Sequence, residues 1–393
     1  MRYPLKYGLF MAAYYITNSV YQGFITLYYK SAGMNEAQRG ILIAAVSLVS
    51  VFAQPFWGGV GDRARSRARV IRLLCLGACV MVGLFFSAGS SFGLLLAFTC
   101  VFAAFYTSIQ PMGDSVILES LQEHDQSFGP IRWCGCVSFA LSSMLFGRVV
   151  DGGGRENLIL FTAAGLLILT LFSTFALPQT GGAQNSGEKR SMRELFRQKD
   201  LMMLIGLTMP LQLTMGYFYG FFSTHFVSLP GGNEALLGWC YLISALSETP
   251  FLLLSDKLFK KFGAGKLMTV SAVLLTARWT LLASTTSVPI AMLSQILHGG
   301  GFIVITVTMA KYISKTVAPE LRSSGQMLLA LTGFGIARVA GNFLGGLAAQ
   351  TMGEQSVFWL CAAVTFAALI GFGPYYMKHA PFNGEKPAET TEE

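Results

Sequence analysis

Charged side chains are scarce in this sequence. They make up 12% of its 393 residues, against about a quarter in an ordinary soluble domain, while the apolar AVILMFWYC set makes up 53%. This apolar surface is too large for a single soluble core, and it is arranged in runs long enough to span about 30 Å of hydrocarbon. A water-soluble globular protein is therefore excluded, and we expect a multi-pass membrane protein.

The chain also lacks the residue clusters that build metal, redox or catalytic centres. Its seven cysteines lie within or at the ends of apolar runs, and their odd number argues against a disulfide framework. Cys134 and Cys136 have no Cys or His cluster near them in the sequence, so zinc and redox chemistry are not supported. No span contains a Ser/His/Asp set, paired aspartates or a His-x-x-x-His pattern. We expect no enzyme activity, no metal and no cofactor.

Apolar runs of about 20 residues predict twelve transmembrane helices. The predicted spans are roughly 5–29, 40–59, 70–87, 92–119, 131–150, 158–177, 201–229, 235–254, 267–283, 289–313, 327–349 and 357–376. The long polar stretch 178–200 separates six spans from six. We expect an all-α membrane protein made of two pseudo-symmetric six-helix bundles. The predicted parts are an N-terminal bundle at 1–177, a cytoplasmic linker loop at 178–200, a C-terminal bundle at 201–377 and a cytoplasmic tail at 378–393.

Lysine and arginine are distributed unevenly between the two sides of these spans. The side that carries both termini has 22 of the 28 basic residues, and the opposite side has four. Because basic residues accumulate in cytoplasmic loops, we expect both termini in the cytoplasm. The net charge of +8 then follows from topology, and nucleic acid is not an expected partner.

Few ionisable residues lie inside the predicted spans, where they are costly and usually functional. They are Asp114, Glu248, Arg132, Arg278, Arg338 and His298, with Glu119 nearer the end of span four. A carboxylate accepts hydroxyl hydrogens and a guanidinium donates in a fixed fork, so Asp114 and Arg132 are the first candidates for a solute site. The alternative is a pair that only fixes helix register. Three arginines against two carboxylates leave one positive charge, which an organic anion could neutralise.

Polar and aromatic side chains recur at helical spacing in four spans. They are Tyr14, Asn18, Tyr21 and Tyr28 in span one, Tyr106, Gln110 and Asp114 in span four, Gln212, Tyr219 and Ser223 in span seven, and Gln295, His298 and Phe302 in span ten. Offsets of three, four and seven place each set on one helix face. Amides and a carboxylate among the rings predict a wetted cavity for a polar solute. Aromatic stripes alone are typical of packing or of the lipid interface.

A short polar pattern recurs after the second and eighth spans, as Gly-Asp-Arg at 61–63 and Ser-Asp-Lys at 255–257. The two aspartates lie about half a chain length apart. Two six-span halves around a central site are the architecture of many secondary transporters.

Several of these segments resemble the oligosaccharide/proton symporters of the major facilitator superfamily, which include the lactose and sucrose permeases. The similar segments are Arg39 to Ser47, Gln54-Pro55-Phe56, Gly61-Asp62-Arg63, Phe128-Gly129-Pro130-Ile131-Arg132, Gly135-Cys136-Val137, and Arg278 with His298 and Lys311-Tyr312-Ile313. Three departures stand beside this resemblance. Gly301 occupies the position of a proton-carrying carboxylate, span seven lacks an aspartate, and Phe139 replaces a tryptophan that stacks on sugar.

The resemblance implies roles for these residues. Asp114 and Arg132 would act on sugar, and the fifth-span and tenth-span positions Phe139 and His298 would line the site. Glu248, Arg278 and His298 form the candidate set for proton coupling. Asp62, Arg63 and Asp256 would belong to a cytoplasmic gate. The full predicted solute site is Asp114, Arg132, Tyr14, Asn18, Tyr21, Gln110, Phe139, Gln212, Tyr219 and His298.

We therefore expect a secondary active transporter that moves a small polar solute, with a sugar or oligosaccharide favoured, by alternating access and proton symport. The alternative is a proton-coupled importer of an organic anion or a nucleoside-like solute. A drug exporter is disfavoured because arginines oppose the buried acids, and a non-transporting receptor because the tail is short. The expected partners are the solute, the proton and the lipid bilayer, with the chain acting as a monomer.

Overall fold

The structure of the protein, a computed structural model, describes residues 3–122, 128–179, 193–317 and 321–378. Most of the predicted linker loop and of the predicted tail lies outside these residues. The described residues form helices and their short connections. The helices are α1 (Tyr3–Ser31), α2 (Glu36–Arg63), α3 (Arg67–Ala88), α4 (Phe92–Tyr106), α5 (Ile109–Gln122), α6 (Gly129–Val150), α7 (Asn157–Ser173), α8 (Arg193–Arg197), α9 (Lys199–Ser228), α10 (Glu234–Ser284), α11 (Val288–Leu293), α12 (Val304–Thr316), α13 (Arg322–Leu329), α14 (Arg338–Met352) and α15 (Glu354–Lys378).

The all-helical membrane fold predicted from the sequence is confirmed. Ten stretches of the described residues are long and apolar enough to cross a membrane. One of them, α10, has 51 residues and contains the predicted spans eight and nine. Helix α1, with 29 residues, corresponds to the first predicted span.

Local sequence explains where two of these helices start and bend. At the start of α2, the Asn35 side chain accepts a hydrogen bond from the Gln38 backbone and the Gln38 side chain accepts one from the Asn35 backbone. This capping box satisfies amide groups that have no partner within the helix. In α10, Gly263 adopts φ 71°, a left-handed conformation that favours glycine. The chain therefore kinks at Gly263, between the predicted spans eight and nine.

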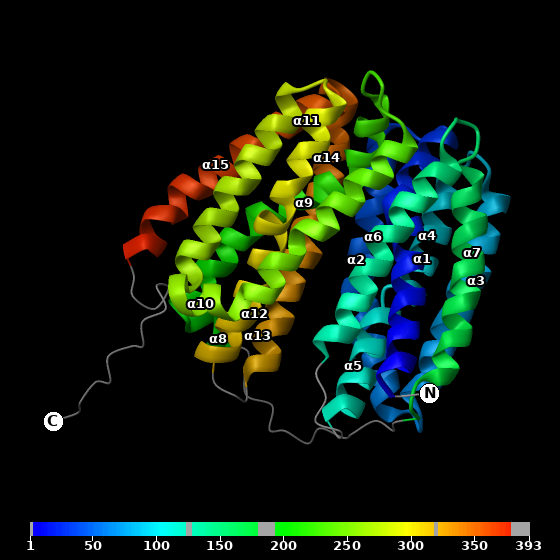
Figure 1. Cartoon of the computed structure of the whole chain (residues 1–393), viewed down its shortest axis with the longest axis horizontal. Helices are drawn as coiled ribbons and strands as arrows, with labels where there is room; N and C mark the ends of the chain where they lie inside the picture. Colours follow the sequence, from blue (N-terminus) through cyan, green and yellow to red (C-terminus); the bar gives the residue numbers. More distant parts are fainter. Residues whose placement is uncertain (1–2, 123–127, 180–192, 318–320, 379–393) are drawn as a thin grey trace. The chain divides into compact units, whose positions relative to one another are not determined.

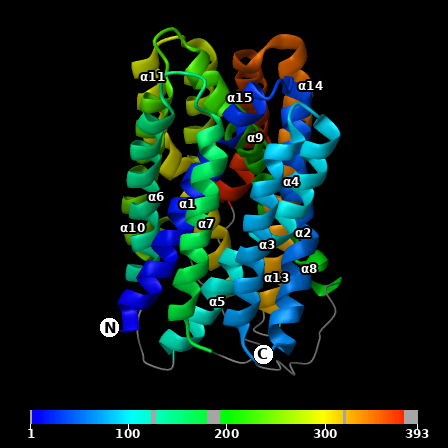
Figure 2. The ribbon, with the colours of Figure 1, turned by 90° about the vertical axis from the view of Figure 1, so that its right-hand side faces the viewer.

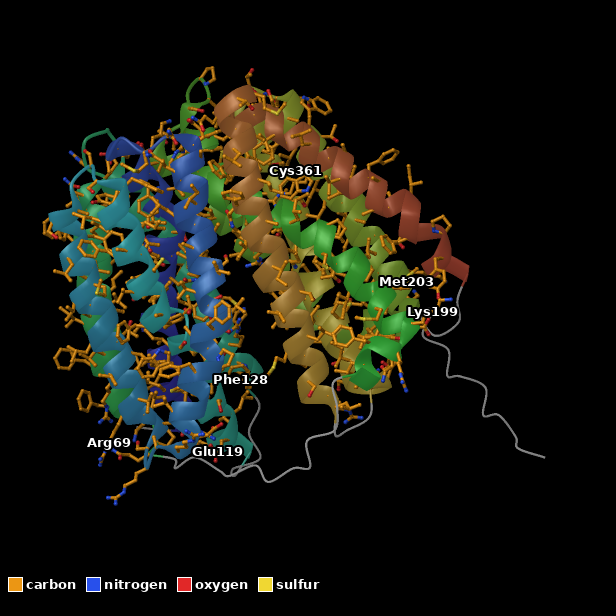
Figure 3. All side chains as sticks on the ribbon, turned by 180° about the vertical axis from the view of Figure 1, so that it is seen from behind. Arg69, Glu119, Phe128, Lys199, Met203 and Cys361 are labelled. Carbon is orange, nitrogen blue, oxygen red and sulfur yellow. The ribbon has the colours of Figure 1, made fainter. Side chains whose placement is uncertain are left out.

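The chain divides into two compact units. Unit 1 joins Met1–Ser186 with the segments Tyr217–Leu242 and Asn342–Thr351. Within it, α1 packs against α6 and α7, while α3 packs against α4 and α7 (Figures 1 and 2). Figure 3 shows Arg69 and Glu119 at the same end of this unit.

Glycines bring the helices of unit 1 into close contact. A Cβ atom added to Gly40 of α2 would lie 2.9 Å from the Cα of Gly346 on α14. A Cβ added to Gly147 of α6 would lie 3.2 Å from the Cα of Gly238 on α10. Small residues allow such backbone contact in membranes, where the hydrophobic effect does not drive helices together. At Gly40 and at Gly147, where two helices cross, there is therefore no room for a side chain.

Unit 2 comprises Gly187–Gly216, Ile243–Gly341 and Met352–Glu393. Its spans ten and eleven are interrupted by π-helical turns at Gly299–Ile303 and Ala330–Ala337. Such turns are rare and frequently occur at functional sites. The indole of Trp279 is fully buried, donates a hydrogen bond to the Thr214 hydroxyl at 3.1 Å, and stacks on Phe358.

Candidate functional site

Asp114 and Arg132 lie next to each other in unit 1, on α5 and α6. Nη1 of Arg132 donates to Oδ2 of Asp114 at 3.4 Å, and the side chains are 39% and 22% exposed respectively. The guanidinium carbon of Arg132 lies 5.1 Å from the ring centroid of Tyr15, within cation–π distance. The pair is thus a partly exposed charge pair resting on an aromatic face.

The surroundings of this pair retain hydrogen-bonding capacity. Nε2 of Gln110 donates to the Tyr15 hydroxyl at 3.0 Å. Oδ1 of Asp114 accepts no hydrogen bond from the residues that the structure describes. An ionised carboxylate has about four acceptor positions. Oδ1 of Asp114 is buried, so a solute hydroxyl would reach the exposed part of this side chain, beside the contact with Arg132.

Behind Tyr15 lies a cluster of aromatic rings from α1 and α4. The Tyr14 ring stacks on Tyr106 at 5.7 Å, and Tyr21 lies 5.6 Å from Tyr106. The Tyr106 hydroxyl donates to Oδ1 of Asn18 at 3.2 Å. Because Tyr14 and Tyr21 are buried, their rings form a packed layer behind the more accessible Arg132 and Asp114.

The other predicted solute-site residues are distributed over both units. Phe139 on α6 and Tyr219 on α9 belong to unit 1, where both are half-buried. Gln212 and His298 belong to unit 2, where both are buried. Gln212 contacts Arg338, and His298 contacts the candidate coupling residues.

The candidate coupling residues form one continuous series of polar contacts in unit 2. Arg278 is buried; its Nη1 lies 2.7 Å from Nδ1 of His298, and its Nη2 donates to Oε1 of Gln295 at 2.5 Å. Nε2 of His298 lies 3.3 Å from Oε1 of Glu248. A guanidinium can only donate, so Nδ1 of His298 must accept and the ring proton must lie on Nε2, where it faces Glu248. A second ring proton would disrupt the contact with Arg278.

Gln295, which the sequence places on the polar face of span ten, and Ser244, which had no predicted role, hold these polar contacts in place. The Ser244 hydroxyl donates to Oε1 of Gln295 at 3.0 Å, and Nε2 of Gln295 donates to the Ala291 carbonyl at 3.1 Å. Ser244 precedes Glu248 by one helical turn on α10. This spacing was a signal in the sequence that could have linked the two residues, because residues four apart share a helix face.

Arg338, whose role the sequence left open, lies beside both π-helical turns. Its Nε and Nη2 donate to Oε1 of Gln212 at 3.3 and 3.2 Å. Its guanidinium carbon lies 4.9 Å from the Phe334 centroid and 5.6 Å from that of Phe302. The π-helical turns carry these two phenylalanines, so they present both rings to the same cation.

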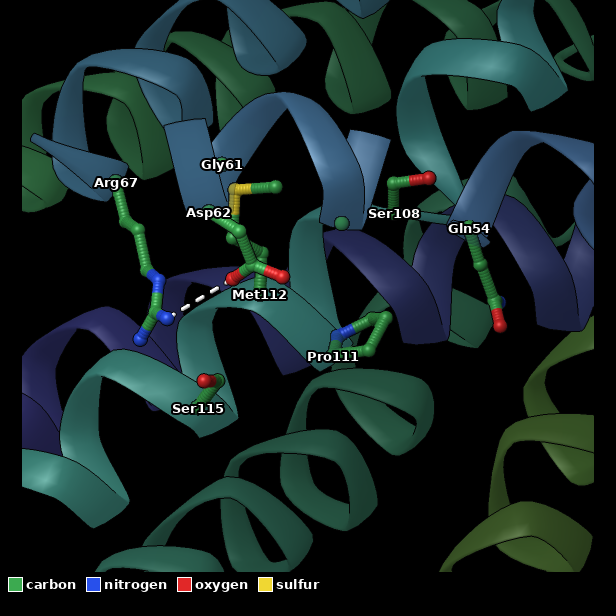
Figure 4. Close-up of a pocket in the computed structure, with 9 residues that line it drawn as sticks. Gln54, Gly61, Asp62, Arg67, Ser108, Pro111, Met112 and Ser115 are labelled. Atoms are coloured by element: carbon green, nitrogen blue, oxygen red, sulfur yellow. Dashed lines mark hydrogen bonds and ion pairs between the residues drawn. The ribbon is translucent and has the colours of Figure 1, made fainter. Parts of the chain in front are cut away.

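The predicted gate residues form ion pairs in each unit. In unit 1, Nη2 of Arg67 donates to Asp62 at 2.9 Å (Figure 4). Nη1 of Arg67 donates to Glu119 at 2.8 Å, so Arg67 bridges α2 and α5. In unit 2, Nζ of Lys311 donates to Asp256 at 2.7 Å, and this contact lowers the pKa of the Asp256 carboxyl. Arg63 is exposed. Arg67 and Lys311 are therefore the basic partners that the sequence had not assigned to the gate.

A small cavity adjoins the Asp62 and Arg67 pair (Figure 4). It is lined by Gln54, Gly58, Gly61, Asp62, Arg67, Ser108, Pro111, Met112 and Ser115, and its volume is about 140 Å³. Ligand pockets usually measure about 300–1,000 Å³. The cavity is thus too small for an oligosaccharide and belongs to the packing around the ion pairs.

A family model described as "MFS_1 like family" matches residues 4–360. The chain belongs to this family. As an MFS_1 like protein it is a multi-pass secondary transporter of the major facilitator superfamily and not an enzyme. The resemblance to the oligosaccharide/proton symporters is confirmed as distant homology, because maltose, lactose and raffinose permeases are among its relatives.

Relatives of this MFS_1 like transporter carry different names. The maltose permease of Geobacillus stearothermophilus is 22% identical and the match covers 87% of this chain and 86% of that protein. The probable 3-phenylpropionic acid transporter of Escherichia coli (strain K12) is 26% identical, covering 91% and 93%. The crystal structure of the nucleoside transporter NupG superposes with a TM-score of 0.82 at 17% identity, covering 96% and 100%. These matches establish the fold.

Proposed function

We propose that this transporter moves a small hydroxylated solute, a sugar or oligosaccharide, which binds at Asp114 and Arg132. The observation that carries this proposal is the partly exposed ion pair on the face of Tyr15. Asp114 accepts hydroxyl hydrogens and Arg132 donates to hydroxyl oxygens, while the buried ring of Tyr15 supports the guanidinium. The name of the maltose permease relative points to the same class of solute.

The proposed transport is by alternating access and coupled to protons, with Glu248 as the carrier and His298 and Arg278 as its neighbours. A neutral His298 that donates to Glu248 stabilises the carboxylate, and protonation of Glu248 removes that charge from the membrane. Position 301 carries Gly301, which has no titratable side chain. The contact of Glu248 with His298 therefore favours Glu248 for this role.

A second candidate solute is an organic acid with an aromatic ring. Arg338 lies over both Phe302 and Phe334 in unit 2, an arrangement suited to a carboxylate next to a ring. The similarity to a probable 3-phenylpropionic acid transporter favours the same class. A nucleoside-like solute is a third class, since NupG shares the fold.

Binding measurements on the purified protein distinguish these classes. We expect maltose or a related oligosaccharide to raise the melting temperature, because a ligand stabilises the folded state that binds it. Arg132→Lys should abolish this rise, whereas Arg148→Lys, at an exposed arginine near the end of α6, should retain it. A rise with 3-phenylpropionate that Arg338→Lys abolishes, without a response to sugars, would favour the organic acid instead.

The proposed orientation places both termini in the cytoplasm, on the basis of the uneven distribution of basic residues. A C-terminal fusion to green fluorescent protein should then fluoresce, and a fusion to alkaline phosphatase should be inactive. The reverse pair of results would contradict this orientation.

A further inference from the structure

Two arginines of α3 lie at one end of unit 1 and are distinct from the gate. Arg69 is exposed, and Figure 3 shows it at the end of the unit. The guanidinium carbon of Arg72, one helical turn further along, lies 4.2 Å from the ring centroid of Phe175. Phe175 belongs to the 3-10 turn after α7 and is 62% exposed. The ring holds Arg72 at the surface between α3 and the end of α7.

The positive charge of these arginines is not neutralised within residues 3–122 and 128–179. Neither Arg69 nor Arg72 forms an ion pair with the described part of unit 1, and Nε of Arg72 is buried without a hydrogen-bond acceptor there. Arg67 differs, since Asp62 and Glu119 both contact it. Stacking on a ring does not use the N–H donors of a guanidinium, and of the donors of Arg72 only Nε is buried without an acceptor in the described part of the chain. Two cations with available donors therefore lie side by side.

The surface next to these arginines is apolar. Its large exposed side chains are Leu73, Leu76 and Val80 on α3 and Phe161, Ile168, Leu169 and Phe172 on α7. Helices α3 and α7 pack against each other in unit 1, so these side chains form one lipid-facing surface. It ends at Arg69, Arg72 and Phe175, at the end of unit 1 where Figure 3 shows Arg69.

We propose that Arg69 and Arg72 bind the phosphate of an anionic glycerophospholipid whose acyl chains lie along α3 and α7. Basic residues at the membrane surface attract anionic headgroups, and basic pockets between transmembrane helices bind them specifically. The adjoining apolar surface favours a lipid over a free phosphate ion, which would gain nothing from it. A headgroup with a net negative charge is favoured over a zwitterionic one, because two arginine charges need compensation.

Native mass spectrometry of the full chain in detergent tests this site. Phosphatidylglycerol and phosphatidylcholine with the same acyl chains are titrated onto the wild type and onto the double variant Arg69→Gln/Arg72→Gln. We expect the double variant to bind phosphatidylglycerol about tenfold more weakly and phosphatidylcholine as before. Arg148→Gln, which removes an exposed arginine from α6, should bind phosphatidylglycerol as the wild type does.

Phe175→Leu tests the geometry separately, because it keeps the apolar surface and removes the ring. We expect phosphatidylglycerol to bind about threefold more weakly, as Arg72 loses its support. If the double variant does not fold, Arg69→Gln gives the same test, because its side chain is exposed. Equal phosphatidylglycerol binding by these variants and Arg148→Gln would overturn the proposal. Displacement of the lipid by millimolar inorganic phosphate would show a phosphate site instead of a lipid site.

Discussion

At the scale of single residues, the proposed solute site depends most on Arg132. Arg132→Lys keeps the charge but loses the planar fork and the contact with Tyr15. We expect solute binding to weaken by about 1.5–3 kcal/mol. Isothermal titration with the solute identified by thermal shift measures this, with Arg148→Lys as the control. Unchanged affinity in Arg132→Lys would remove Arg132 from the site.

The charged residues of the candidate site could be selected from the sequence, but not all of the residues that they contact. Asp114 and Arg132 were recognisable because charges are rare within apolar spans. Tyr15 was not, because it lies one position away from the predicted polar face of span one. Its ring reaches Arg132 across Gly135, where an added Cβ would lie 3.1 Å from a Tyr15 ring carbon. Packing between α1 and α6 therefore decides which tyrosine faces the pair.

At the scale of helices, the glycine contacts of α2 should limit what the helix tolerates. A Cβ at Gly40 would lie 2.6 Å from the Asn342 carbonyl oxygen and 2.9 Å from the Gly346 Cα. Overpacking of this kind costs about 1–3 kcal/mol, so we expect Gly40→Ala to lower the melting temperature. Gly58→Ala is the matched control, since no atom lies within 4 Å of its added Cβ. An equal effect of both substitutions would contradict the importance of this crossing.

The ion pairs that join helix ends make a different prediction. Asp62→Asn removes one of the two carboxylates that hold Arg67 between α2 and α5. If Asp62 stabilises one state of the gate, transport should slow, while equilibrium affinity for the solute changes only through the shift in populations. Uptake into proteoliposomes and binding in detergent measure the two effects. Lost binding with unchanged accessibility of the gate would argue for a direct role in the solute site.

Helix interruptions are harder to predict than the helices themselves. The run Gly299-Gly300-Gly301 was visible in span ten, but its π-helical geometry was not. There the Gly299 amide donates to the Ser247 hydroxyl at 2.9 Å. That contact joins residues 52 positions apart. Only the packed structure brings them together, which is why a local pattern does not reveal the turn.

At the scale of the whole molecule, composition and the lengths of the apolar runs were sufficient for the fold. In lipid, a spanning segment must satisfy its backbone hydrogen bonds internally. Apolar runs of this length are therefore expected to form transmembrane helices. The compact units were less predictable. Unit 1 includes Tyr217–Leu242 and Asn342–Thr351, because glycines there allow close contacts with α2 and α6. Such contacts depend on how each helix is oriented in the packed structure, and they produce no periodic pattern in the sequence.

The coupling of solute transport to proton movement is a property of the whole transporter. A substitution of Glu248 can test it. Glu248→Gln mimics the protonated carboxyl and can still accept a hydrogen bond from His298. If Glu248 carries the proton, the variant should retain solute binding and counterflow exchange but lose uphill accumulation driven by a pH gradient. If Glu248 only stabilises His298 and Arg278, the variant should mainly lose thermal stability. Accumulation and exchange in the same proteoliposomes separate these outcomes, with Glu234→Gln at the start of α10 as the control. Accumulation by Glu248→Gln at the wild-type level would mean that another group, such as Asp114, carries the proton or that transport is not proton-coupled.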